Sequence, residues 1–108
     1  MSQLNAEKVY QSLIESGEDW ADKQAAAELL EENKKSVLAE LANKCLENSL
    51  GARESLALAD PAYRLHLANM VDARHAANRA KVRYDAIKVL SEMRRTIEST
   101  RRAEMQMR

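Results

Sequence analysis

The sequence predicts an all-α fold, and three observations carry this prediction. Alanine is the commonest apolar residue, with 18 alanines in 108 residues, and phenylalanine is absent. The chain has only two glycines and one proline, whereas a β fold needs a turn about every ten residues. Charged residues make up 31% of the chain, and a composition rich in Ala, Glu, Lys, Leu and Arg is typical of long helices. We therefore expect one helical domain over residues 1–108, with thin seams between closely spaced helices.

The first expected element is a short helix over residues 5–16. Asn5 has the side chain to cap it, and Leu4 before the cap is placed to pack on Val9. Gly17 follows the last apolar position of this segment. We expect Gly17 to end the helix by adopting the left-handed conformation that glycine tolerates best.

The second expected element is an acidic helix over residues 18–50. Its apolar positions recur three or four residues apart from Ala26 or Ala27 to Cys45, as on one face of a helix. Lys34 and Lys44 interrupt a strict heptad, so the pattern indicates an amphipathic helix. Gly51 is expected to stop it, and residues 51–60 are expected to form the connector, either as a loop or with a helical turn or two before Asp60.

The third expected element is a long basic helix over residues 61–102. Asp60-Pro61 matches a helix start, with a capping residue followed by proline at the first helical position. No glycine or proline interrupts the chain after Pro61. We expect this helix to fold back on the acidic helix as a long antiparallel, coiled-coil-like hairpin, which dimerises into a helical bundle.

Charge supports the pairing of the two long helices. Residues 1–60 carry a net charge of −6, and residues 74–108 carry +6. The stretch DARHAANRAKVRYD (72–85) is therefore interpreted first as a helix-packing seam flanked by basic residues, and second as a strip that contacts phosphate. The predicted packing seam consists of Leu30, Leu41, Cys45, Met70, Ala73, Ala77, Ala80, Tyr84 and Ile87.

A second basic group lies near the C-terminus. Arg94 and Arg95 are repeated seven residues later by Arg101 and Arg102, which places both pairs on similar faces of a helix. Three interpretations remain open: a solvated helix end, a phosphate contact, or a docking site for an acidic protein. This C-terminal segment contains no aromatic residue for base stacking and no glycine for a helix-turn-helix, which disfavours binding to nucleic acid.

Catalytic and metal-binding patterns are not found in the sequence. His66 and His75 are nine residues apart and fall on different faces of one helix, so they do not share a metal. Cys45, the single cysteine, follows the apolar spacing and is expected to be a packing thiol in a reducing cytosol. No apolar run approaches the roughly 20 residues that cross a bilayer. We expect a cytoplasmic protein without enzymatic activity, cofactor or membrane contact.

Three short patterns resemble a group of small helical proteins encoded by bacteriophages and prophages. They are W-x-D-K at Trp20, L-L-E-E at Leu29 and A-x-V-R-Y-D at Ala80, and the likeness covers about residues 18–100. Such proteins are often encoded near phage recombination and single-strand annealing genes. The resemblance implies a phage-encoded accessory protein in the bacterial cytoplasm, and it assigns no residue a role.

Three functions are consistent with these observations. The first is an interaction protein, a homodimer that docks on a phage or host protein of DNA metabolism as an adaptor or inhibitor. The second is direct DNA binding through the arginine-rich C-terminal helix. The third is a phage assembly factor such as a scaffold or connector. Salt dependence separates the second from the first, because contact with phosphate releases counterions.

Overall fold

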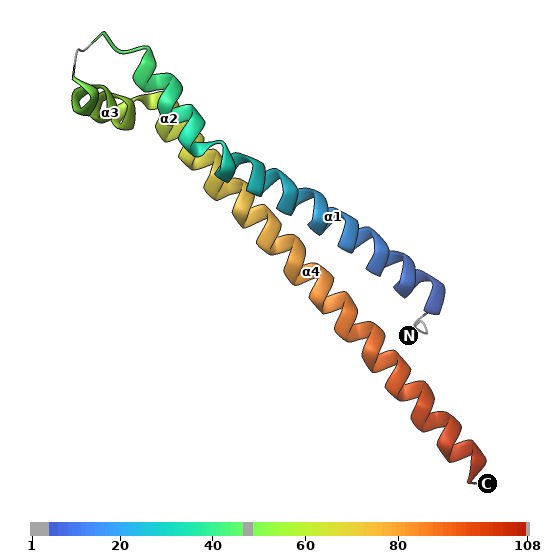
Figure 1. Cartoon of the computed structure of the whole chain (residues 1–108). Coiled ribbons are helices and arrows are strands. Elements are labelled where there is room, and N and C mark those ends of the chain that lie inside the picture. The colour runs from blue at the N-terminus through green and yellow to red at the C-terminus, as the bar shows by residue number, and fades with distance from the viewer. Residues whose placement is uncertain (1–4, 47–48, 108) are drawn as a thin grey trace. The chain divides into compact units, whose positions relative to one another are not determined.

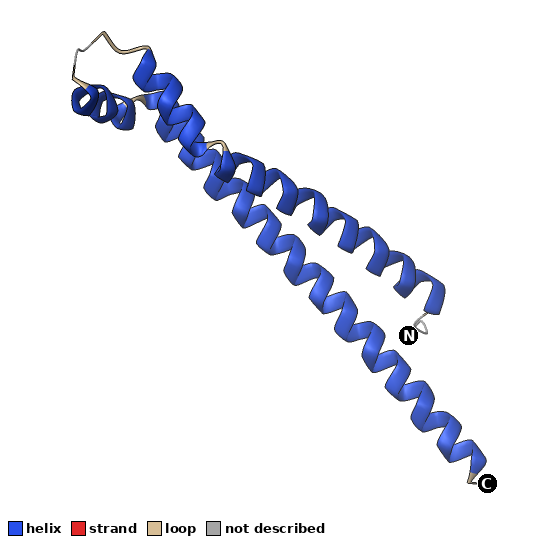
Figure 2. Ribbon diagram, in the orientation of Figure 1, coloured by secondary structure: helices blue, strands red, loops and turns tan. Residues whose placement is uncertain are grey.

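The computed structural model describes residues 5–46 and 49–107, and in these ranges it contains helices and no strand (Figures 1 and 2). The prediction of an all-α chain is therefore confirmed. The helices are α1 (Ala6–Glu32), α2 (Lys34–Asn43), α3 (Leu50–Ala59) and α4 (Pro61–Gln106). The chain divides into two compact units. Unit 1 combines Met1–Ala21 with Asn78–Arg108, and unit 2 is Asp22–Ala77.

The start of α1 follows the predicted capping pattern. The side-chain Oδ1 of Asn5 accepts hydrogen bonds from the backbone N–H groups of Glu7 at 2.9 Å and Lys8 at 3.3 Å. These two donors would otherwise lack a partner within the helix. The predicted contact of Leu4 with Val9 lies outside the described residues.

The predicted end of the first helix at Gly17 is wrong, because α1 continues through it to Glu32. No described glycine has a positive φ angle. A glycine inside a helix costs only about 1 kcal/mol relative to alanine, and no proline follows to enforce a stop. The predicted short helix 5–16 and the first part of the predicted helix 18–50 are therefore one element.

The predicted acidic helix is interrupted at Asn33, between α1 and α2. Hydrogen bonds of helical spacing continue across this residue: Asn33 donates to the Leu29 carbonyl at 3.0 Å, and Val37 donates to the Asn33 carbonyl at 2.9 Å. In the last turn of α1, the Leu30 carbonyl accepts a hydrogen bond from Nε2 of His66 at 2.9 Å. A side chain of α4 thus satisfies a carbonyl at the end of α1.

The predicted boundary at residues 50 and 51 is also wrong. Helix α2 ends at Asn43, and Ser49 begins the next helix with extended angles, φ −84° and ψ 132°. Its side chain accepts a hydrogen bond from the Ala52 N–H at 3.3 Å. Because a capping residue with an extended ψ cannot lie inside a helix, the predicted helix 18–50 cannot be continuous. Gly51 lies within α3, and the predicted connector 51–60 is mostly helical.

The start of α4 agrees with the sequence prediction. Asp60 has extended angles, and its Oδ1 accepts a hydrogen bond from the Ala62 N–H at 2.8 Å. Pro61 is the first helical residue, a position where its missing N–H is not needed. The helix continues to Gln106, beyond the predicted end at residue 102, since no breaking residue intervenes.

The buried side chains are mostly small. Among the described residues, the buried apolar ones are Val9, Ala27, Ala42, Ala57, Tyr63, Ala77 and Ala80. Alanines at these positions let helix backbones approach closely, but each contributes little buried apolar area. The chain is therefore held together by thin contacts between helices, as its composition predicted.

Candidate functional site

In unit 1, the N-terminal part of α1 lies alongside the C-terminal part of α4 (Figure 1). The rings of Trp20 and Tyr84 have centroids 5.4 Å apart and an interplanar angle of 34°. Further toward the start of α1, Leu13 lines one groove together with Ser91. As the residue number falls on α1 it rises on α4, so the two segments are antiparallel.

Gly17 permits the close approach of these two segments. A Cβ atom at this position would lie 3.2 Å from Cε1 of Tyr84, closer than an ordinary van der Waals contact. The ring of Tyr84 therefore occupies the space that a side chain of residue 17 would fill. Nearby, Nη1 of Arg83 lies 3.7 Å from Oδ2 of Asp19, which adds a longer ion pair across the same contact.

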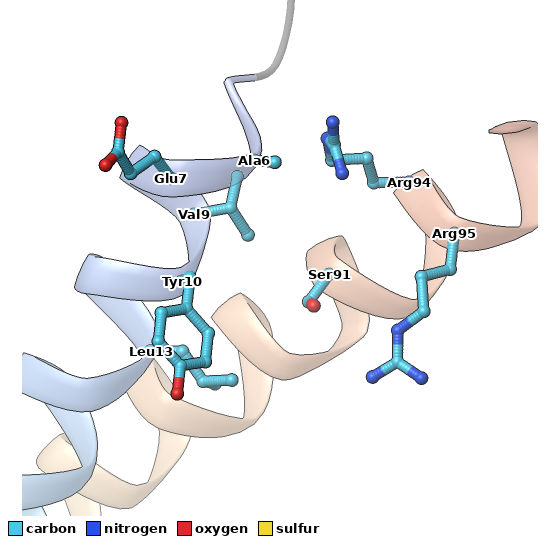
Figure 3. A pocket seen from close by; sticks show the side chains of 8 residues that line it. All are labelled: Ala6, Glu7, Val9, Tyr10, Leu13, Ser91, Arg94 and Arg95. Atoms are coloured by element: carbon cyan, nitrogen blue, oxygen red, sulfur yellow. The ribbon is translucent and has the colours of Figure 1, made fainter.

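A groove opens between the first turns of α1 and residues 91–95 of α4 (Figure 3). Its volume is about 550 Å³. Val9 is buried and Leu13 is half-buried, so the groove has an apolar floor. The residues that line it are Ala6, Glu7, Val9, Tyr10, Leu13, Ser91, Arg94 and Arg95. The groove combines apolar surface with cationic groups at one end.

The two arginines of the groove differ in their surroundings. Nη2 of Arg94 contacts Oε1 of Glu98 at 2.8 Å, and the Arg94 side chain is only 23% exposed. Figure 3 shows Arg94 directed toward Ala6 and Arg95 directed away from it. Arg95 is exposed and forms no ion pair with any residue in the ranges 5–46 and 49–107. The groove thus has one guanidinium held in place and one available to a ligand.

Arg101 and Arg102, the other two predicted contact residues, lie outside the groove. Both are exposed, on a stretch of α4 in which every residue from Thr96 to Met107 except Glu98 is exposed. Neither forms an ion pair with another described residue. The structure therefore separates the predicted arginine set into a pair at the groove and a pair on the solvated end of α4.

The predicted packing-seam residues fall into both units. Tyr84, Ile87 and Ala80 are half-buried or buried in unit 1. In unit 2, Ala77 is buried, and the half-buried seam residues are Leu30, Leu41, Cys45, Met70 and Ala73. The exposed fraction of Ala77 is 1%, which indicates close contact at this position.

Cys45 lies in the segment between α2 and α3 and not on a continuous helix. Its Sγ is 3.4 Å from the Leu41 carbonyl and 3.9 Å from the Arg53 carbonyl. Both carbonyls can accept a weak hydrogen bond from the thiol. The side chain therefore contacts the end of α2 and the start of α3, within unit 2.

An ion pair in unit 2 joins oppositely charged segments of the chain. Nε and Nη2 of Arg74 donate to Oε1 and Oε2 of Glu31, each at 2.9 Å. The hydrogen bond from Arg74 lowers the pKa of Glu31, and the same bond raises the pKa of Arg74. This bidentate geometry orients α1 against α4 in unit 2 more specifically than a single contact would.

The α1 side of the groove was not predicted as part of a site. Val9, Tyr10 and Leu13 are recognisable in the sequence as an apolar stripe, but the expected break at Gly17 separated them from the long helix. The signal in the sequence that could have indicated this contact was the spacing of apolar residues, three and four apart, in both segments. It did not indicate which residues of the two stripes meet.

Among the described residues, no group of His, Cys, Asp or Glu could hold a metal ion. Searched over the same part of the chain, the helices include none with the length and apolar character needed to cross a membrane. The chain matches no protein-family model, no curated protein and no solved structure.

Proposed function

We propose that this protein is a non-enzymatic interaction protein that binds an acidic helical segment of another protein in the groove of unit 1. The groove supports this proposal because apolar surface beside exposed arginine is typical of the centre of a protein–protein interface. The sequence resemblance predicts a phage or host protein of DNA metabolism as the partner, and this stays a prediction.

The chemistry of the groove suits a carboxylate with an apolar side chain beside it. Arg95 presents a planar guanidinium that matches the two oxygens of a carboxylate. Arg94 is already oriented by Glu98, so little conformational entropy is lost when a ligand contacts it. Beside these groups, an apolar side chain of the partner would contact Tyr10 and Leu13, which line the same groove.

Direct DNA binding is the alternative, and one observation favours it. Arg95, Arg101 and Arg102 are exposed and form no ion pair with described residues, so they are available to phosphate. Binding of this kind would weaken steeply as the salt concentration rises. Docking in an apolar groove would weaken much less.

We also propose that the chain folds as an antiparallel hairpin and forms a homodimer. In unit 1 the α1 segment contacts α4 through Trp20 and Tyr84, and in unit 2 through Glu31 and Arg74. These contacts support a chain that folds back on itself. The dimer is supported by the small size of the buried residues, since a thin core gives a marginal monomer.

Affinity capture from expressing bacterial cells tests the groove, with the full-length chain and two variants. Arg95→Glu reverses the exposed charge of the groove, and Arg79→Glu is the matched control at another exposed position of α4. We expect a specific captured protein whose yield falls at least fivefold with Arg95→Glu and is unchanged with Arg79→Glu.

Equal capture by both variants would contradict the groove as the docking site. The same preparations are titrated with a fluorescent DNA oligonucleotide at increasing salt. Specific DNA binding that both Arg95→Glu and a double Arg101→Gln, Arg102→Gln variant weaken, with no captured protein, would replace the proposal with the alternative.

A further inference from the structure

Helix α4 carries a second stripe in unit 1, uncharged and largely apolar, on the side that faces away from α1. Its positions alternate four and three residues apart, which is the spacing of a heptad seam. We call it the outer stripe, and it consists of Val82, Ala86, Val89, Met93, Thr96, Thr100, Ala103 and Met107. None of these side chains is charged, although charged residues make up 31% of the chain.

The burial pattern shows that the outer stripe is a separate face. The positions of α4 that face α1 are buried or half-buried, and they are Ala80, Tyr84, Ile87, Ser91 and Arg94. The outer stripe is displaced from them by two residues, or about 200° around the helix. All its members are exposed, and Val82 remains 68% exposed. No described segment of unit 1 covers this face.

The N-terminal limit and the length of the outer stripe are those of a coiled-coil seam. Just before it, the same spacing falls on Arg79, which is charged, and on the polar His75. From Val82 to Met107 it spans just under four heptads, about the length that indicates a coiled coil. Leu90 and Ile97 lie beside it and are also exposed, which widens the apolar face.

We propose that the outer stripe pairs with the outer stripe of a second copy of this chain, in antiparallel orientation. This inference rests on the homodimer of the proposed function and specifies its face and register. The register is centred between residues 94 and 95, so that Val89 meets Thr100 of the second copy. Met93 then meets Thr96 of the second copy.

The flanking residues select this register. An antiparallel coiled coil centred there places Arg83 opposite Glu104 of the second copy, so opposite charges meet. It also places Leu90 opposite Ile97 of the second copy, which covers both exposed side chains. On the other flank Asp85 and Glu92 lie opposite the uncharged Gln106 and Ser99. No like charges face each other.

The parallel arrangement is less favourable for the same residues. In a parallel pair, each flanking residue meets the residue five positions later in the partner. Asp85 would meet Leu90, and Glu92 would meet Ile97, so that carboxylates would lie against apolar side chains. No pair of opposite charges would form. The sequence of the stripe therefore favours the antiparallel pair.

Disulfide trapping tests the register in a Cys45→Ser background. One variant carries Val89→Cys and the other Thr100→Cys, and both positions are exposed, so the fold of each chain should be retained. Circular dichroism checks the helix content. Mixed under mild oxidation at micromolar concentration, the two variants should form a disulfide-linked heterodimer in most of the protein.

Each variant alone is the control. In the proposed register, two copies of residue 89 lie 11 residues apart along the pair, or about 16 Å, which is too far for a disulfide. Efficient linking of Val89→Cys to itself would overturn the antiparallel register. A dimer of twice the chain mass by light scattering, without the heterodisulfide, would overturn the inference and leave the proposed dimer standing. A monomer would overturn both.

Discussion

At the scale of single residues, the ion pair of Glu31 and Arg74 has a measurable consequence for pH dependence. Arg74 lowers the pKa of Glu31 in the folded chain below its ordinary value of 4.5. A carboxylate with a lowered folded-state pKa stabilises the fold above its unfolded-state pKa. This stabilisation is lost as the pH falls through the folded-state pKa.

We therefore expect Glu31→Gln to lower the free energy of unfolding at neutral pH, and the difference from the parent chain to shrink below about pH 4.5. Urea unfolding, followed by circular dichroism between pH 7 and pH 3, measures the free energy of unfolding of both chains. Glu32→Gln is the control, because Glu32 is the neighbouring carboxylate, is exposed and forms no ion pair with another described residue. A difference that stays constant with pH would contradict the prediction.

At the scale of the elements, α1 is continuous because Gly17 is accommodated as a helical residue against α4. A side chain there would meet the ring of Tyr84, whereas the nearest atom to a Cβ at Gly51 is Oγ of Ser49 at 3.8 Å, an ordinary contact. The two glycines therefore make a matched pair. Both lie inside helices, but only one lies under a packed ring.

Gly17→Leu is expected to destabilise the chain by about 1 kcal/mol, because overpacking outweighs the gain in helix propensity. Gly51→Leu is expected to be neutral or stabilising. Trp20 is the single tryptophan, so its fluorescence reports whether Tyr84 has moved. The same change of stability for both variants, with unchanged fluorescence, would refute the role given to Gly17.

At the scale of the whole molecule, the buried residues are too small to supply much hydrophobic stabilisation. Five of the seven buried apolar residues among those described are alanines, while large side chains such as Val82 and Ile97 are exposed. Exposed apolar patches often mark interaction sites, and we propose that association of the chain covers part of this surface. Association couples folding to protein concentration.

We expect light scattering to give about twice the chain mass of 12.2 kDa at micromolar concentration. The thermal midpoint should rise as the protein concentration rises, because the dimer is favoured by mass action. Val89→Glu, on the exposed outer stripe, should abolish this dependence, whereas Lys88→Glu beside the stripe should not. A midpoint independent of concentration in the parent chain would contradict the dimer.

The sequence by itself determined the helical class and two of the helix starts. Composition excluded strands, and Asn5 and Asp60-Pro61 act through contacts with neighbours two or three residues away. Such local contacts form in the same way whatever the tertiary structure around them. The cap at Ser49 is a local signal of the same kind. It was missed because the apolar pattern of the predicted helix 18–50 reached Cys45, so that helix was expected to run past Ser49.

Only the tertiary structure decided whether Gly17 ends a helix or lies inside one, and which residues line the groove. Glycine permits both a helix end and a helix interior, and the packing of Tyr84 against it is a contact between residues 67 positions apart. Once α1 is continuous, its rise per residue carries Val9 and Leu13 to the level of Arg94. Arg94 and Arg95 could be named from the sequence as contact residues, but the apolar floor beside them depends on the register between two helices, which periodicity alone leaves open.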